Sequence, residues 1–234
     1  VKDLQRDPVA AWQHKHYWTL AWGTNLGFTG VLALIHGDIL GTLLLVGVAR
    51  LTLSQHVTFF INSLAHMYGK RPYSVENTAR DNGWIALITY GEGYHNFHHR
   101  FASDYRNGLR WWQFDPTKWA IRGFSFVGLT SNLRRYSEER IERAKALVQL
   151  SRAEERVERG LAAEEWLEQI KGEYDLLCQQ MNEFYEAKKS LIEAKKQALV
   201  NTEEVLELKK QYLELKGLWF EQRRQWNLML ALKV

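Results

Sequence analysis

Three histidines lie within five residues of one another in the segment GEGYHNFHH, which ends at His99. His95, His98 and His99 occupy positions i, i+3 and i+4, so on a helix their imidazoles share one face. Neutral imidazole is a good ligand for iron, zinc and copper. A lone histidine is usually an ordinary core or surface residue, whereas this spacing predicts a metal site.

A second polar pair is formed by Asn62 and His66, which are four residues apart at the end of an apolar stretch and share one helical face. Polar groups at membrane depth are costly and are usually functional. His66 is therefore a candidate further nitrogen ligand. The alternative is that Asn62 and His66 form hydrogen bonds between helices. The other histidines are left outside the site: His14, His16, His36 and His56.

Motifs for other kinds of chemistry are absent from the sequence, which contains no HExxH, no glycine-rich phosphate loop and no serine nucleophile elbow. Cys178 is the single cysteine, so the sequence excludes an intrachain disulfide framework and a cysteine-rich metal cage. A hydrolytic zinc centre would bring a carboxylate close to the histidines, and Glu92 is the only one nearby. The sequence thus favours a redox metal.

Two apolar stretches precede the histidines and are long enough to position them at a membrane. Residues 18–35 carry no charge, and residues 39–65 are interrupted only by Arg50 and the ionisable His56. A helix needs about 20 apolar residues to cross a bilayer. The pattern predicts a tight membrane hairpin with both ends on one side; the alternative is a buried hairpin of a soluble protein.

Residues 67–137 interleave basic and aromatic side chains, which suits a surface at the level of lipid headgroups. Ordinary solvated loops with some buried aromatic residues are the alternative. The formal net charge is +4, made up of +6 before residue 138 and −2 after it. This excess is too small and too one-sided to indicate nucleic-acid binding.

Residues 138–234 contain no proline and are rich in strong helix formers. Every seventh residue from Ile170 onward belongs to one series, which predicts a helical, coiled-coil-like extension. The pattern leaves open a single rod or a hairpin, in which Asn201 to Glu204 would cap a new helix. The series consists of Ile170, Leu177, Phe184, Leu191, Ala198, Val205, Tyr212, Trp219 and Trp226.

Three strings, DLQRDPVAAWQHKHYW, INSLAHMYGKRPY and GEGYHNFHHRFASDYRNG, closely resemble the membrane acyl-CoA-type Δ9 fatty-acid desaturases, which include the stearoyl-CoA desaturases. The resemblance covers residues 1–135, and the bacterial branch is the closest. It implies an all-α integral membrane fold in which a cytosolic helical cap carries the histidine box and two iron ions are bound. Carried over by motif, the metal ligands are His66, His95, His98, His99 and Asn62. Thr58 and Phe59 match the bend of the family's acyl tunnel, and Arg50 matches a family arginine to which we assign no role.

The sequence departs from the family pattern in lacking the first two histidine boxes, an HxxxxH and an HxxHH that lie upstream of DLQRDP in the family. Their two membrane helices are missing with them. We therefore interpret residues 1–137 as the C-terminal part of a desaturase domain and residues 138–234 as an added extension. By itself the chain is expected to be inactive and to hold no complete di-iron centre.

The activity implied by the resemblance is O2-dependent insertion of a cis double bond, at Δ9, into a saturated acyl-CoA or acyl lipid. Electrons would come from a ferredoxin-like or cytochrome-b5-like donor, for which Arg100, Arg106 and Arg110 form a candidate docking cluster. The expected location is a bacterial inner membrane, in contact with membrane lipids, with the iron site and the C-terminal tail in the cytoplasm.

Two other functions remain open at the level of sequence. One is a histidine-box hydroxylase or alkane oxidase, and the other is a non-catalytic membrane-anchored helical scaffold. The role of the extension is also open between self-association, donor docking and binding to a membrane surface.

Overall fold

The computed structural model describes residues 4–196 and 202–231, and the chain divides into two compact units, Val1–Ser63 and Leu64–Val234. The described residues form helices, and among them the only β-pairing consists of isolated bridges. The first unit contains η1 (Leu4–Arg6), α1 (Pro8–Lys15), α2 (Tyr17–His36), α3 (Ile39–Thr42), η2 (Leu43–Ala49) and α4 (Arg50–Asn62). The second contains α5 (Leu64–Met67), α6 (Gly83–Ile88), α7 (His95–Arg100), α8 (Pro116–Phe126), α9 (Glu138–Glu158), α10 (Glu164–Lys196) and α11 (Thr202–Ala231).

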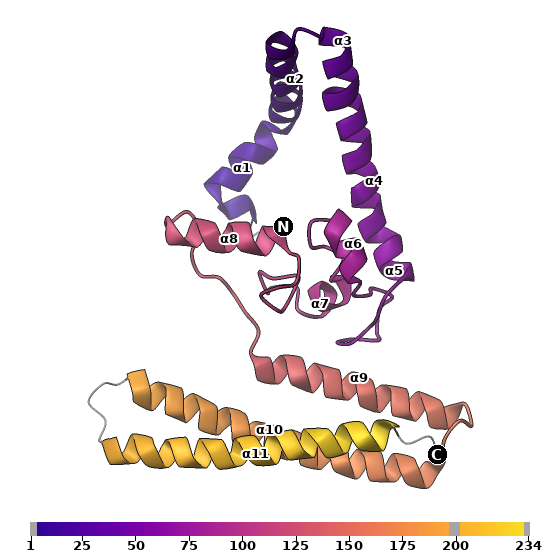
Figure 1. Cartoon of the computed structure of the whole chain (residues 1–234), viewed down its shortest axis with the longest axis vertical. Helices are drawn as coiled ribbons and strands as arrows, with labels where there is room; N and C mark the ends of the chain where they lie inside the picture. The colour runs from indigo at the N-terminus through magenta and orange to yellow at the C-terminus, as the bar shows by residue number, and fades with distance from the viewer. Residues whose placement is uncertain (1–3, 197–201, 232–234) are drawn as a thin grey trace. The chain divides into compact units, whose positions relative to one another are not determined.

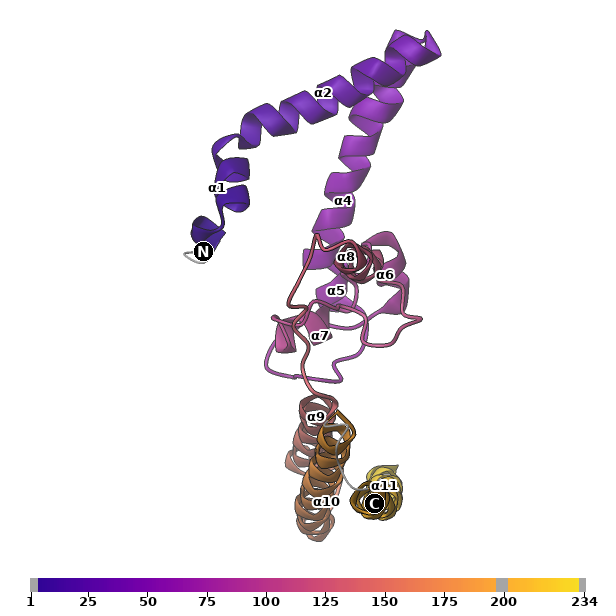
Figure 2. The same ribbon diagram turned by 90° about the vertical axis from the view of Figure 1, so that its left-hand side faces the viewer.

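The first unit is a helical hairpin whose turn is set by two residues (Figures 1 and 2). Gly37 ends α2 with φ 81°, a left-handed conformation that glycine adopts without a steric penalty. The carboxylate of Asp38 then caps α3 by accepting a hydrogen bond of 2.9 Å from the backbone N–H of Gly41. Across the hairpin, Arg50 Nη2 donates a hydrogen bond of 2.5 Å to Asn25 Oδ1. The charged guanidinium in this apolar stretch is therefore paired with an amide on the other arm of the hairpin.

Two helical stretches, Tyr17–His36 and Ile39–Met67, are long and apolar enough to cross a membrane. Few of their side chains are buried, whereas the core helix of a soluble protein would be mostly buried. The second stretch is continuous apart from the π-helical segment η2 and an irregular residue, Ser63. These features agree with the predicted membrane hairpin.

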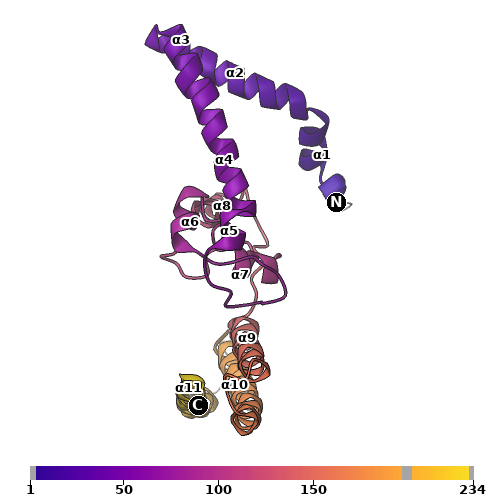
Figure 3. The ribbon, with the colours of Figure 1, turned by 90° about the vertical axis from the view of Figure 1, so that its right-hand side faces the viewer.

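Within residues 138–196 and 202–231 the C-terminal extension forms three helices, α9, α10 and α11, so it is not a single rod (Figures 1 and 3). Gly160, with φ 67°, lies in the break between α9 and α10. α10 and α11 run side by side in opposite directions. Ala198 and Asn201, which belong to the predicted seven-residue series and cap, lie outside the described residues. The buried series residues are Ile170, Leu177, Phe184, Leu191, Trp219 and Trp226, and all of them except Leu191 belong to one hydrophobic core.

A smaller core joins the histidine-bearing region to the extension. Tyr73, Phe97 and Phe101 pack with Ile141 and Ala144 of α9, and all five are buried. Because Phe97 is part of α7, this core fixes the histidine helix against α9. Residues 137 and 138, where the composition of the sequence changes, therefore lie within one compact unit. The domain boundary placed between them stays a prediction.

A buried ion pair holds the connection into α9. Asp104 accepts hydrogen bonds from Arg106 Nε at 2.9 Å and Nη2 at 2.8 Å, and from the backbone N–H of Tyr136 at 2.9 Å. Burial alone would raise the pKa of Asp104, but these hydrogen bonds and the charge of Arg106 lower the pKa overall. The ionised carboxylate is thus stabilised in the folded state.

We expect Asp104→Asn to destabilise the fold by about 2 kcal/mol at pH 7, because it leaves the Arg106 guanidinium without its counter-charge. A carboxylate whose pKa is depressed by folding contributes stability above its unfolded pKa of about 3.9 and loses it as pH falls toward the folded value. The difference between wild type and variant should therefore shrink below pH 4. Thermal unfolding at pH 7 and pH 3.5 measures this, with Asp175→Asn on the exposed face of α10 as the control. If the stability difference between wild type and Asp104→Asn is the same at pH 7 and at pH 3.5, the stabilising role of the ionised Asp104 carboxylate is contradicted.

Candidate metal centre

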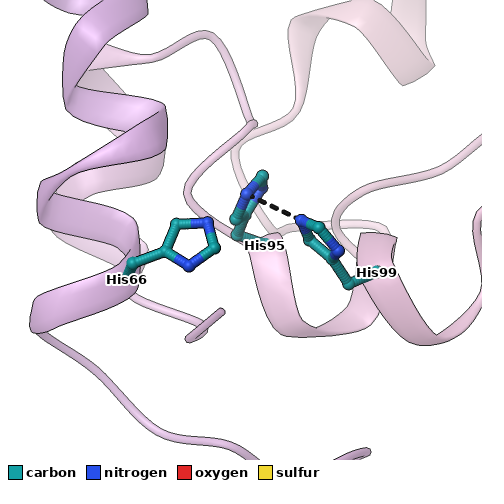
Figure 4. A group of neighbouring side chains, drawn as sticks. All are labelled: His66, His95 and His99. Atoms are coloured by element: carbon teal, nitrogen blue, oxygen red, sulfur yellow. Dashed lines mark hydrogen bonds between the residues drawn. The ribbon is translucent and has the colours of Figure 1, made fainter. Parts of the chain in front are cut away.

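Three of the predicted ligands lie together in the second unit (Figure 4). His66 projects from α5, and His95 and His99 project from successive turns of α7. One ring nitrogen of each lies within 4.8 Å of the others. His95 Nε2 and His99 Nε2 are 3.0 Å apart, and the ring centres of His66 and His95 are 4.8 Å apart. The predicted helix is confirmed, and His66 lies close to His95 and His99 as predicted; the role of these histidines as metal ligands stays a prediction.

His98, the fourth predicted histidine ligand, lies beside this cluster. Its ring centre is 6.1 Å from that of His95, with the planes nearly parallel, and 6.0 Å from that of His99. His98 is half-buried and is not among the three histidines whose ring nitrogens lie within 4.8 Å of one another. Its role as a ligand stays a prediction.

The electrostatics of the cluster favour neutral imidazoles. Burial, followed by the proximity of His99, His66 and His98, lowers the pKa of His95 to about 4. Burial, followed by the proximity of His98 and His66, also lowers the pKa of His99. A neutral imidazole carries the free lone pair that a metal ion requires.

The histidine helix is held in place by Asn96, which is fully buried and uses its whole side-chain amide. Its oxygen accepts from the backbone N–H groups of Tyr73 and Ser74 at 2.9 and 3.3 Å. Its nitrogen donates to the carbonyls of Ser74 and Ala79, both at 2.9 Å. Asn96 therefore ties the loop that precedes α6 to the helix that carries the ligands.

Two aspartates complete this support. Asp81 accepts from the backbone N–H of Phe97 at 3.0 Å, near the start of α7. Asp115 is fully buried and accepts from the N–H groups of Asn107 and Gly108, both at 2.8 Å. Asp81 thus holds α7 directly, whereas Asp115 holds the loop that follows α7. The sequence analysis missed both residues, because their spacing from the histidines carries no periodic signal.

Glu92, the one carboxylate close to the box in sequence, has a structural partner. Its Oε1 accepts a hydrogen bond of 2.7 Å from Asn107 Nδ2. It does not belong to the group of side chains that converge on the candidate metal position.

Thr58, Phe59 and Asn62 belong to α4 in the first unit. Thr58 Oγ1 donates to the carbonyl of Ser54 at 3.0 Å, and the Phe59 side chain is 61% exposed. The assignment of Asn62 as a ligand and of Thr58 and Phe59 to an acyl tunnel stays a prediction.

The residues present fit a metal ion that prefers imidazole. Two nitrogens that each lie about 2.1 Å from one ion are about 3 Å apart when they occupy neighbouring coordination positions. His95 Nε2 and His99 Nε2 have this separation. In addition, His95 Nδ1 is buried and finds no hydrogen-bond partner among the described residues. Imidazole ligands suit iron, zinc and copper, so the ligand types alone do not select among these metals.

Thr78 emerges as a positioning residue for His66. Its Oγ1 lies 2.8 Å from His66 Nδ1, although the two residues are separated by a loop. A hydrogen bond to one ring nitrogen of a ligating histidine fixes the tautomer and directs the other nitrogen to the metal.

Thr78→Val should weaken metal binding about 10- to 100-fold, because the isosteric valine cannot hold the His66 ring. Titration of the purified chain with Co²⁺, followed by its visible absorption bands, reports both affinity and ligand geometry. Thr78→Ser should restore binding, and Thr117→Val on the exposed side of α8 serves as the control. Wild-type affinity and an unchanged spectrum in Thr78→Val would rule out the positioning role.

The described residues thus define a helical protein with membrane-spanning character and a site built from histidines. Residues 2–126 match the family model for fatty acid desaturases. The chain belongs to the fatty acid desaturase family, as the sequence resemblance predicted.

Individual relatives point to the stearoyl-CoA-like members of that family. The chain is 42% identical to acyl-CoA desaturase 1 of Saccharomyces cerevisiae over 145 residues, which are 62% of this chain and 28% of that protein. It is also 42% identical to a probable acyl-CoA desaturase of Schizosaccharomyces pombe over 144 residues, 61% of this chain and 30% of the relative. Stearoyl-CoA desaturase 5 of Bos taurus is 38% identical over 148 residues, 62% of this chain and 44% of the relative. The matched region thus spans less than half the length of each of these relatives.

Proposed function

We propose that this chain is part of an O2-dependent desaturase that inserts a cis double bond, at Δ9, into a saturated fatty acyl chain. The observation that carries the proposal is the convergence of His66, His95 and His99 in a chain of the fatty acid desaturase family. Acyl-CoA is the substrate favoured by the names of the yeast relatives, with acyl lipid as the other carrier.

In this proposal two iron ions are held by His66, His95, His98, His99 and Asn62, together with histidines of the family's first two boxes, which this sequence does not contain. Bound iron supplies the O2-dependent removal of two hydrogens from adjacent methylene groups. This chain contributes ligands of fixed orientation. His95 is only 6% exposed, so its own ring nitrogens are shielded from water, whereas His66 is half-buried and His99 is exposed.

The tunnel residues Thr58 and Phe59 are proposed to set which carbon meets the metal. An apolar tunnel positions the acyl chain by excluding water and fixing its bend. Phe59→Ala in the whole protein should change the preferred chain length or the double-bond position, with a shift of several-fold in product ratio. Gas chromatography of the products measures this. The tunnel assignment fails if rate, chain preference and bond position all stay unchanged.

The electron donor is proposed to be an acidic ferredoxin-like or cytochrome-b5-like protein. Of the three arginines in the predicted docking cluster, Arg106 is engaged by Asp104, whereas Arg100 and Arg110 are exposed. Attraction between exposed charges weakens as salt shortens the Debye length from about 10 Å at 0.1 M. Raising the salt concentration should therefore slow reduction of the whole enzyme, and salt-independent reduction would exclude this cluster.

The membrane hairpin is proposed to hold the site at the cytoplasmic surface, with the C-terminal helices on the same side. The relatives include fungal, bovine and bacterial proteins, and the bacterial inner membrane expected from sequence stays a proposal. The extension remains available for self-association, donor docking or contact with lipid.

The decisive experiment is analysis of fatty acids in yeast cells that lack their own acyl-CoA desaturase and express the whole protein containing this chain. Mass spectrometry should detect monounsaturated chains with the double bond at carbon 9, and His95→Ala should abolish them. Hydroxylated chains in their place would indicate a hydroxylase. A stably expressed protein that yields neither product would favour the scaffold function.

A further inference from the structure

A cleft of about 830 Å³ lies within the second unit, between the loop that follows the histidine box and the three helices of the extension. α9, α10 and α11 all contribute to its walls, together with residues 106–110 and 135–136. Its volume falls within the range of about 300–1,000 Å³ typical of pockets for small molecules. The cleft is separate from the histidine cluster, none of whose residues line it.

The cleft is strongly basic. Seven lysines and arginines line it against two glutamates. Arg106, Lys145, Lys188 and Arg223 are engaged by carboxylates. Among the described residues, Arg110, Arg135 and Lys216 have no carboxylate partner. A concave surface with this excess of positive charge concentrates field lines and attracts an anion.

The same cleft has aromatic walls. Six aromatic side chains line it. Phe184 stacks on Tyr212 with a centroid distance of 5.6 Å and lies parallel to Trp219, so these rings form a rigid layer. Phe220 is 58% exposed, and Lys216 Nζ lies 6.0 Å above its ring centre. Exposed ring surface next to cations that lack a carboxylate partner is the combination that binds a base and its phosphates together.

We propose that this cleft binds a nucleoside diphosphate, with the base against the exposed ring of Phe220 and the phosphates on Arg110, Arg135 and Lys216. Inorganic phosphate or a lipid headgroup would use the cations and leave the aromatic surface uncovered. An acidic protein would need a broad, flat surface rather than a concave pocket. The nucleotide can be free in solution, or it can be the nucleotide part of coenzyme A. The second source rests on the proposed function.

Isothermal titration calorimetry of the purified full chain in detergent micelles tests this with ADP, coenzyme A and inorganic pyrophosphate. ADP should bind at least tenfold more tightly than pyrophosphate, since only ADP carries a base. Coenzyme A binding tenfold more tightly than ADP would identify the acyl carrier as the source, and equal or weaker binding would identify a free nucleotide. No binding of either nucleotide at millimolar concentration, or equal affinity for pyrophosphate and ADP, would overturn the proposal.

Matched variants locate the binding site. The combined changes Arg110→Gln, Arg135→Gln and Lys216→Gln should weaken ADP binding at least tenfold. The control combines Arg122→Gln, Lys209→Gln and Lys210→Gln, which remove the same charge from exposed positions outside the cleft and should leave affinity unchanged. Equal losses in both triple variants would show a non-specific charge effect and contradict the assignment.

Phe220→Ala provides a test that does not depend on charge. Because the ring is exposed, the variant should fold, which circular dichroism checks. It should weaken ADP binding about fivefold and leave pyrophosphate binding unchanged. Unchanged ADP affinity would exclude stacking on Phe220. Metal content measured on the same samples distinguishes failure of this proposal from failure of the desaturase proposal, because the binding assay needs neither iron nor turnover.

Discussion

Replacing His95 by alanine is expected to lower the affinity of the chain for Fe²⁺ by more than about 100-fold, a larger loss than that from removing a supporting hydrogen bond. His95 is the most buried of the three clustered histidines and lies closest to both of the others. Its loss leaves His66 and His99 with ring centres 5.7 Å apart and no nitrogen between them. Metal analysis after gel filtration in detergent measures the retained iron per chain.

His56→Ala is the matched control for this prediction. His56 lies in α4, is exposed, and places Nδ1 2.8 Å from the carbonyl oxygen of Thr52 on its own helix. Iron content should therefore remain at the wild-type level. Equal retention of iron by His95→Ala and wild type would exclude the cluster as the metal centre.

Gly93→Ala is expected to abolish metal binding without touching a ligand. A Cβ atom on Gly93 would lie 2.1 Å from the backbone nitrogen of Ala86 and 2.7 Å from the carbonyl oxygen of Asn82. Both are main-chain atoms of the α6 region, which cannot rotate aside as a side chain can. Asn82 also donates its N–H to the Gly93 carbonyl over 2.8 Å. The methyl group must therefore separate α6 from the segment that leads into His95.

The expected cost is about 3 kcal/mol or more, since overpacking against fixed atoms usually costs 1–3 kcal/mol. Thermal unfolding and Co²⁺ titration should show a lower midpoint and no saturable binding. Gly123→Ala in α8 is the control, because a Cβ there meets nothing within 4 Å and alanine favours the helix. Wild-type binding by Gly93→Ala would show that the close approach of these two segments is not required.

The histidine spacing and the apolar stretches were readable from sequence because each depends on local periodicity. His95, His98 and His99 share a face as soon as their segment becomes helical, whatever surrounds it. The two long apolar runs likewise determine their own hairpin, with Gly37 as the turn residue. Most described members of the seven-residue series in the extension are buried, and Val205 and Tyr212 are half-buried, because the period of the helix determines which side chains face the partner.

The number of helices in the extension could not be derived in the same way. The hydrophobic period is the same whether the extension forms a rod, a hairpin or three helices. Gly160 lies at the break between two helices, but the sequence of the extension contains other glycines and does not mark this one as the break. Only packing of α9, α10 and α11 around Trp226 and its neighbours selects the three-helix arrangement. The cleft that we propose to bind a nucleotide exists only in that arrangement.

The sequence by itself thus predicted the kinds of candidate ligand and the helix that carries three of them, and it determined the membrane-spanning character, because all of these follow from residue type and local spacing. The tertiary structure decided which histidines converge. His66 meets His95 and His99 across a loop that is fixed by Asn96, and Thr78 reaches His66 from within the same loop. Contacts between residues far apart in sequence depend on the conformation of the loop between them. That conformation produces no periodic pattern in the sequence from which it could be predicted.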